Sequence, residues 1–77
     1  MTKKMSLESG MRIDDIAREM QDTANAVKAQ LRALGREFWE TGDADKIARK
    51  NEELGKMIAE LAELHKSITA VIEKGEN

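Results

Sequence analysis

Apolar residues recur along most of this chain at alternating spacings of four and three. The first such row, which continues without a gap from residue 13 to residue 38, comprises Ile13, Ala17, Met20, Ala24, Val27, Leu31, Leu34 and Phe38. This spacing keeps side chains on one face of an α-helix and is typical of coiled coils, in which helices pack along their length. The row therefore predicts a long amphipathic helix over about residues 10–40.

A second row with the same spacing lies in the C-terminal half of the chain. It comprises Ile47, Asn51, Leu54, Ile58, Leu61, His65, Ile68 and Ile72. It predicts a second helix over about residues 44–74, which Gly75 ends. Residues 1–8 carry no such row, so we expect a frayed N-terminal lead, with Ser6 or Ser9 as the helix cap, before a single domain over residues 9–77.

The segment between the two rows, residues 41–43, has the composition of a tight turn. Gly42 suits the left-handed conformation that ends a helix, and Asp43 suits the N-cap of the next helix. Such a short connection forces two helices to run antiparallel. The sequence therefore predicts an all-α fold, an antiparallel helical hairpin of two long helices, with Leu34 facing Asn51 and Phe38 closing the turn end. Trp39 lies about 100° further round the helix, away from the contact.

The second helix carries more apolar surface than the first helix is expected to cover. Met57, Leu64 and Val71 form an extra row beside the predicted contact, and Ile16 is the matching large residue of the first helix. Exposed apolar stripes of this kind usually mark an interface. We therefore expect these four residues to form an oligomer interface in a homodimer, a four-helix bundle. A different protein that covers the same stripe is the alternative.

The composition argues against enzymatic and cofactor chemistry. The 77 residues include no cysteine and a single histidine, His65, and they contain no glycine-rich phosphate loop, so we expect no catalytic, cofactor or metal site. Charged residues make up 36% of the chain but nearly cancel to a net charge of -2, which is typical of solvated helices. The chain has no apolar run long enough for a membrane span and no signal peptide pattern, so we expect a cytoplasmic protein.

Two polar residues interrupt the second row, and each has two interpretations. Asn51 either fixes the register and oligomeric state of a buried seam or is a partly wet residue near the turn. His65 is either a pH sensor or a neutral side chain satisfied by one neighbour, which is the commoner case.

A basic ridge on the first helix is the main candidate for function. Lys28, Arg32 and Arg36 are spaced four residues apart in a stretch without acids, residues 23–36, and Trp39 lies beside them. Cations next to a ring are suited to phosphates and nucleic acids, and equally to acidic protein surfaces. The acidic residues near the turn argue against both, and an ordinary solvated face is the third interpretation.

We therefore expect a small non-enzymatic hairpin that binds another macromolecule as an adaptor, regulator or inhibitor. Short chains of this kind are often encoded by phages or mobile elements. The expected partners are a second copy and an unidentified protein, without a membrane. The alternative is an RNA- or nucleotide-binding bundle that uses the basic ridge.

Overall fold

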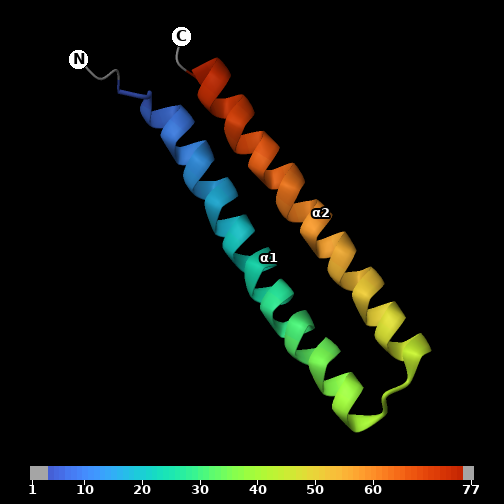
Figure 1. The fold of residues 1–77 in the computed structure, drawn as a ribbon. Helices are drawn as coiled ribbons and strands as arrows, with labels where there is room; N and C mark the ends of the chain where they lie inside the picture. The colour runs from blue at the N-terminus through green and yellow to red at the C-terminus, as the bar shows by residue number, and fades with distance from the viewer. Residues whose placement is uncertain (1–3, 76–77) are drawn as a thin grey trace.

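The protein forms two long antiparallel helices joined by a short turn. The computed structural model describes residues 4–75, in which α1 comprises Leu7–Glu40 and α2 comprises Ala44–Gly75. The two helices lie side by side over their whole length, so that both ends of the chain are at the same end of the molecule (Figure 1). The hairpin measures 57 × 19 × 14 Å. The predicted all-helical hairpin is confirmed.

The first helix begins three residues earlier than the apolar row indicated. Ser6 is the N-cap, because its Oγ accepts a hydrogen bond of 3.2 Å from the backbone N–H of Ser9. This bond satisfies one of the amides that the first turn of a helix leaves without a partner. Leu7 and Glu8 of the expected lead are therefore helical, while residues 1–3 lie outside the described residues.

The end of α1 has the conformation that the turn sequence predicted. Gly42 has a φ of 61°, and the backbone N–H groups of Thr41 and Gly42 both donate to the carbonyl of Glu37, at 3.0 and 3.1 Å. Positive φ at this position is easily reached by glycine, which lacks a Cβ. The chain therefore leaves α1 abruptly, and α2 can return alongside it.

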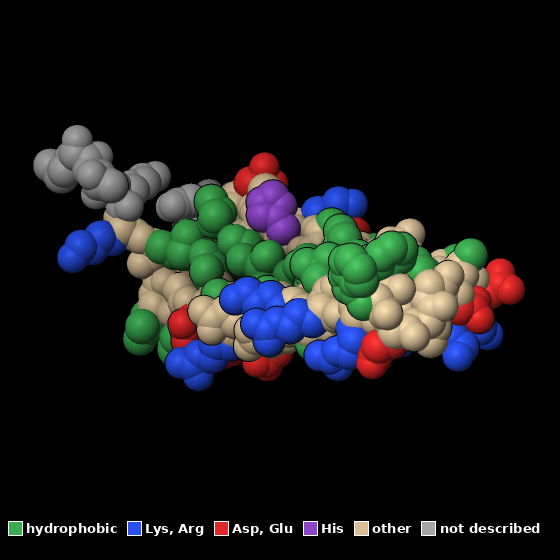
Figure 2. Space-filling model, turned by 60° about the horizontal axis from the view of Figure 1, so that its bottom comes forward, with side chains coloured by type: hydrophobic (Ala, Val, Ile, Leu, Met, Phe, Trp, Pro, Cys, Tyr) green, Lys and Arg blue, Asp and Glu red, His purple; other side chains and the backbone are tan. Residues whose placement is uncertain are grey.

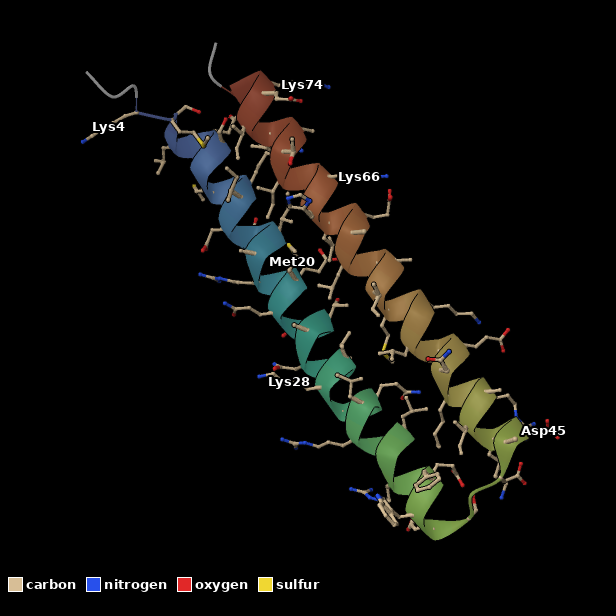
Figure 3. The ribbon with its side chains drawn as sticks, in the orientation of Figure 1. Lys4, Met20, Lys28, Asp45, Lys66 and Lys74 are labelled. Carbon is tan, nitrogen blue, oxygen red and sulfur yellow. The ribbon has the colours of Figure 1, made fainter. Side chains whose placement is uncertain are left out.

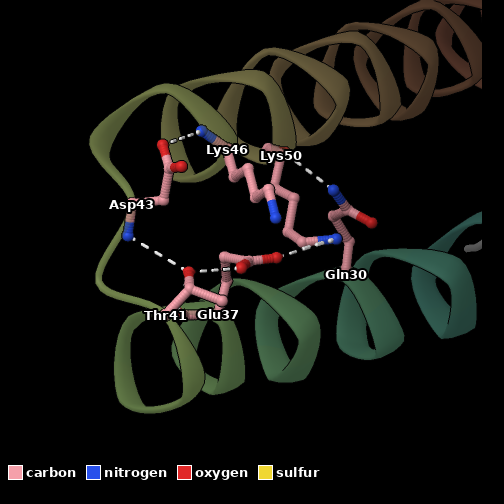
Figure 4. Close-up of polar contacts among 6 residues, drawn as sticks. All are labelled: Gln30, Glu37, Thr41, Asp43, Lys46 and Lys50. Carbon is pink, nitrogen blue, oxygen red and sulfur yellow. Dashed lines mark hydrogen bonds and ion pairs between the residues drawn. The ribbon is translucent and has the colours of Figure 1, made fainter.

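The start of α2 is capped by Asp43, as predicted. Its Oδ1 accepts hydrogen bonds from the backbone N–H groups of Asp45, at 2.9 Å, and Lys46, at 3.2 Å (Figure 4). The hydroxyl of Thr41 accepts a further bond of 3.1 Å from the N–H of Asp43. These bonds link the end of one helix to the beginning of the next.

The two helices face each other through rows that differ in part from the predicted ones. In α1 the row that faces α2 comprises Ile13, Ile16, Met20, Thr23, Val27, Gln30, Leu34 and Glu37, all buried or half-buried, and Ala17, Ala24 and Ala33 beside it are half-buried too. In α2 the corresponding row comprises Ile47, Lys50, Leu54, Met57, Leu61, Leu64, Ile68 and Val71. Every second member of each predicted row is therefore replaced by its neighbour one residue earlier.

The predicted placement of the remaining row members between the helices is wrong. Leu31, Phe38, Ile58 and Ile72 are 51%, 57%, 52% and 44% exposed, and Asn51 and His65 are also exposed. The predicted row and the observed row of each helix share every second residue, and both have spacings that alternate between three and four. Helical periodicity alone therefore fits either row. The observed row of α2 buries Met57, Leu64 and Val71 in place of Asn51 and His65, which avoids placing an amide and an imidazole in an apolar contact.

The expectation that Met57, Leu64, Val71 and Ile16 form an outer stripe is therefore also wrong. Val71 is only 7% exposed, and the other three residues are half-buried. In a two-helix hairpin the only other element that covers a side chain is the opposite helix. These residues consequently contribute to the contact between α1 and α2 and stabilise the hairpin itself.

Polar residues, not Phe38, fill the contact near the turn. The Nε2 of Gln30 donates to the carbonyl of Lys50 at 2.7 Å, and the Nζ of Lys50 lies 3.7 Å from Oε1 of Glu37 (Figure 4). The Glu37 side chain is only 14% exposed, so this ion pair is screened less by solvent than the surface pairs elsewhere. The hairpin is therefore held by polar contacts at the turn end and mainly by apolar contacts further along.

The core between the helices is thin. Among the described residues only Thr23, Leu54 and Val71 are buried, with 9%, 8% and 7% of their surface exposed, and no side chain is below 2%. Two helices cannot enclose a side chain on all sides. The stability of the hairpin therefore depends on a few residues.

Candidate functional site

One broad side of the hairpin presents a row of exposed or half-buried residues from each helix, and we call these rows together the apolar face. The residues are spaced by seven and comprise Ala17, Ala24, Leu31 and Phe38 of α1 and Asn51, Ile58, His65 and Ile72 of α2. In both helices each member of the apolar face directly follows a residue of the facing row, as Ala17 follows Ile16 in α1 and Asn51 follows Lys50 in α2. Two antiparallel helices are related by a two-fold axis perpendicular to the plane that contains them. The row of α1 and the equivalent row of α2 therefore lie on the same broad side of the hairpin.

The apolar face is visible as a band of hydrophobic side chains along the length of the molecule (Figure 2). The single histidine, in purple, lies at the edge of this band. The eight residues of the apolar face include no Asp, Glu, Lys or Arg. The same is true of the eight residues of the facing rows that border them between the helices, at positions 13, 20, 27, 34, 47, 54, 61 and 68. An uncharged surface of this length is rare on a protein that works alone.

The opposite broad side is polar. Its rows comprise Arg12, Glu19, Ala26, Ala33 and Glu40 of α1 and Lys46, Glu53, Glu60, Ser67 and Lys74 of α2. All of them except Ala33 are exposed. The hairpin therefore has one broad side of mainly charged and polar residues and, opposite to it, the uncharged apolar face.

The basic ridge, defined as Lys28, Arg32, Arg36 and Trp39, lies on the outer surface of α1. All four side chains are exposed, and Lys28 points away from α2 (Figure 3). Within residues 4–75, none of the three cations is paired with a carboxylate, whereas Arg18, Lys50 and Lys66 each form an ion pair. The ridge thus presents three charges that no neighbouring carboxylate neutralises.

The two aromatic rings lie at the turn end of α1, where the ridge and the apolar face come close together. Phe38 and Trp39 meet edge to face, with ring centroids 5.0 Å apart and an interplanar angle of 79°. This contact orients the rings but leaves Trp39 84% exposed. Large aromatic side chains exposed to this degree are favoured anchors at protein interfaces.

We expect the fluorescence of Trp39 to resemble that of tryptophan in water. Trp39 is the only tryptophan of the chain, so emission reports on this site alone. Steady-state emission and quenching by a small neutral quencher test the expectation. Blue-shifted, quencher-resistant emission from the free protein would instead mean that another surface covers the ring.

An open hollow of about 360 Å³ lies between the helices near the chain ends and is lined by Glu8, Ser9, Arg12, Ser67, Ala70, Val71 and Lys74. Over residues 4–75, no three side chains of the types that bind metals come together. No described helix is long and apolar enough to cross a membrane.

Comparison with protein-family models, with curated proteins and with solved structures found no match for this chain. The candidate surfaces therefore rest on their own geometry. Sequence reasoning identified the basic ridge, but it misplaced the apolar face by one residue in each heptad. The signal that distinguishes the two rows is the pair of polar residues, Asn51 and His65, which favour the solvent side.

Proposed function

We propose that this protein is a non-enzymatic binding protein whose hairpins pair into a four-helix bundle and whose basic ridge binds an acidic surface of another protein. The observation that carries the proposal is the ridge itself. Lys28, Arg32 and Arg36 are exposed and unpaired, and they adjoin a tryptophan that is 84% exposed. Arginine and tryptophan are the residues most enriched at interface hot spots. Such a protein acts as an adaptor, regulator or inhibitor.

A protein partner is favoured over a nucleic acid by the charges around the ridge. The chain has a net charge of -2, whereas nucleic-acid-binding domains are usually strongly basic. Glu40, Asp43 and Asp45 follow the ridge at the turn end and oppose a phosphate backbone, which is anionic along its whole length, whereas a protein partner can place its acidic residues opposite the three cations alone. Three cations spaced along one helix are sufficient to steer and orient an acidic protein surface.

Photocrosslinking in the cells that produce the protein tests this proposal. A photoreactive amino acid replaces Trp39, and the matched control carries it in place of Ala59, which is exposed on the outer surface of α2. We expect a discrete protein adduct from position 39 and none from position 59. The adduct should be lost when Lys28, Arg32 and Arg36 are all replaced by glutamine, because the attraction depends on their charges.

The same experiment identifies the outcomes that contradict the proposal. An adduct that contains RNA would replace the protein partner by a nucleic acid, for which affinity should fall steeply with salt. An adduct that survives the triple glutamine substitution would exclude the ridge as the binding element. Helicity is the control, since glutamine is nearly as good a helix former as lysine and arginine.

A further inference from the structure

We infer that the apolar face is the surface through which two copies of this chain pair. This inference deepens the proposed function, because it assigns the four-helix bundle to a particular set of residues. The large members of the face, Leu31, Phe38, Ile58 and Ile72, are each between 44% and 57% exposed in the single hairpin. They, and not the row that contains Leu64, are the large apolar side chains exposed on this side of the hairpin.

The hairpin exposes more surface than a compact protein of its mass, and one broad side is large enough for a stable interface. The chain exposes 6211 Å², whereas a compact folded protein of 8.6 kDa is expected to expose about 4,700 Å². A standard stable interface buries about 800 Å² of each partner. The broad side of the hairpin, 57 by 19 Å, has a projected area of roughly 1,000 Å², which is sufficient for such an interface.

The arrangement of large and small residues makes the apolar face complementary to itself. From the open end to the turn, the α1 row runs from the small Ala17 and Ala24 to the large Leu31 and Phe38. The antiparallel α2 row, followed in the same direction, comprises Ile72, His65, Ile58 and Asn51. A copy turned about a two-fold axis parallel to the helices lays its α2 over α1, so that the half of α1 with the small Ala17 and Ala24 lies against the half of α2 that begins at Ile58, which gives the larger side chains room to pack.

The absence of charge and the length of the face also favour a second copy. The face and the eight facing-row residues that border it between the helices include no Asp, Glu, Lys or Arg, so pairing desolvates few formal charges. The face extends along the whole hairpin, and a second hairpin has the same length. A row of small residues on α2, Ala48, Gly55, Ala62 and Thr69, is exposed beside it and allows a neighbouring helix to approach closely.

Sedimentation equilibrium at micromolar concentration tests the inference with a matched pair of variants. Ile58→Glu introduces a charge into the apolar face, and Met11→Glu introduces the same charge at an apolar residue that is 59% exposed outside it. We expect the wild type and Met11→Glu to sediment as dimers. Ile58→Glu should weaken association by at least about 100-fold, because symmetry places each substitution in the interface twice.

A second measurement does not depend on a disruptive variant. The chain has no cysteine, so Ile58→Cys and Met11→Cys each carry one thiol. Alkylation at position 58 should be at least about 10-fold slower than at position 11 when the protein is concentrated, and the difference should vanish on dilution as the dimer separates. Equal rates at all concentrations would overturn the inference.

The outcomes separate this inference from the proposed function. A wild type that is a fully helical monomer at micromolar concentration contradicts both the apolar face and the bundle. A dimer that Ile58→Glu leaves as tight as the wild type contradicts the apolar face but leaves the bundle standing. Failure of the basic ridge to capture a partner changes neither result, because the ridge lies on the outer surface of α1.

Discussion

Leu54→Asp should abolish the helical fold at every protein concentration. Leu54 and Val71 are the two buried hydrophobic residues among those described, and Leu54, the larger, has 8% of its surface exposed and lies between the two helices. Removing a buried leucine side chain alone costs about 2–5 kcal/mol, and a buried carboxylate without a partner adds to that cost. A chain of this size rarely has more than about 3–5 kcal/mol of stability. Circular dichroism should therefore show a largely unfolded chain.

The matched control for this variant is Ala59→Asp. Ala59 lies in the same helix, little more than one turn further along, but it is exposed on the outer surface of α2. Its replacement introduces the same charge without filling or emptying the contact between the helices, so the helical signal should persist. If Leu54→Asp remained as helical as Ala59→Asp, the facing rows described here would be incorrect.

Gly42→Val should have the second largest effect on stability. Gly42 has a φ of 61°, a conformation that costs a residue with a Cβ about 1–2 kcal/mol and a β-branched residue more. The nearest atom to an added Cβ, the carbonyl oxygen of Phe38, lies at an ordinary contact distance of 3.6 Å, so the cost is conformational and not steric crowding. We expect a lower melting temperature, by roughly 4–8 °C for each kcal/mol lost.

Gly42→Asn is the control that isolates backbone conformation. Asparagine adds a Cβ and a polar side chain but visits the left-handed region far more readily than valine. Thermal unfolding followed by circular dichroism should therefore rank the proteins with the wild type first, Gly42→Asn between and Gly42→Val last. Equal destabilisation by both substitutions would mean that side-chain bulk, and not φ, limits this position.

The local signals of the sequence were reliable because each depends on a few neighbouring residues. The positive φ of Gly42 and the capping bonds of Asp43 follow from the intrinsic preferences of glycine and aspartate. The ends of the turn were therefore predictable, and the shortness of the turn required antiparallel helices. The start of α1 was less clear, because both Ser6 and Ser9 suit an N-cap and only the fold selects Ser6.

The exposure of the basic ridge was also predictable. Lys28, Arg32 and Arg36 are spaced by four residues and lie away from either version of the contact row, so they face solvent in both. Whether a partner neutralises them is a different question, which helical periodicity does not address. The structure adds that no carboxylate of the described residues does so.

The sequence by itself determined the two helices, the turn and the polar outer surfaces, because these depend on periodicity and on local backbone preferences. Only the tertiary structure decided which row of each helix faces the other. The predicted row of α2 contains His65, whereas the observed row contains Leu64 in its place. These two neighbouring residues lie about 100° apart around the helix, and either row has the same helical periodicity. The choice depends on how much apolar surface the opposite helix covers and on the pairing of Lys50 with Gln30 and Glu37, contacts between residues distant in the sequence.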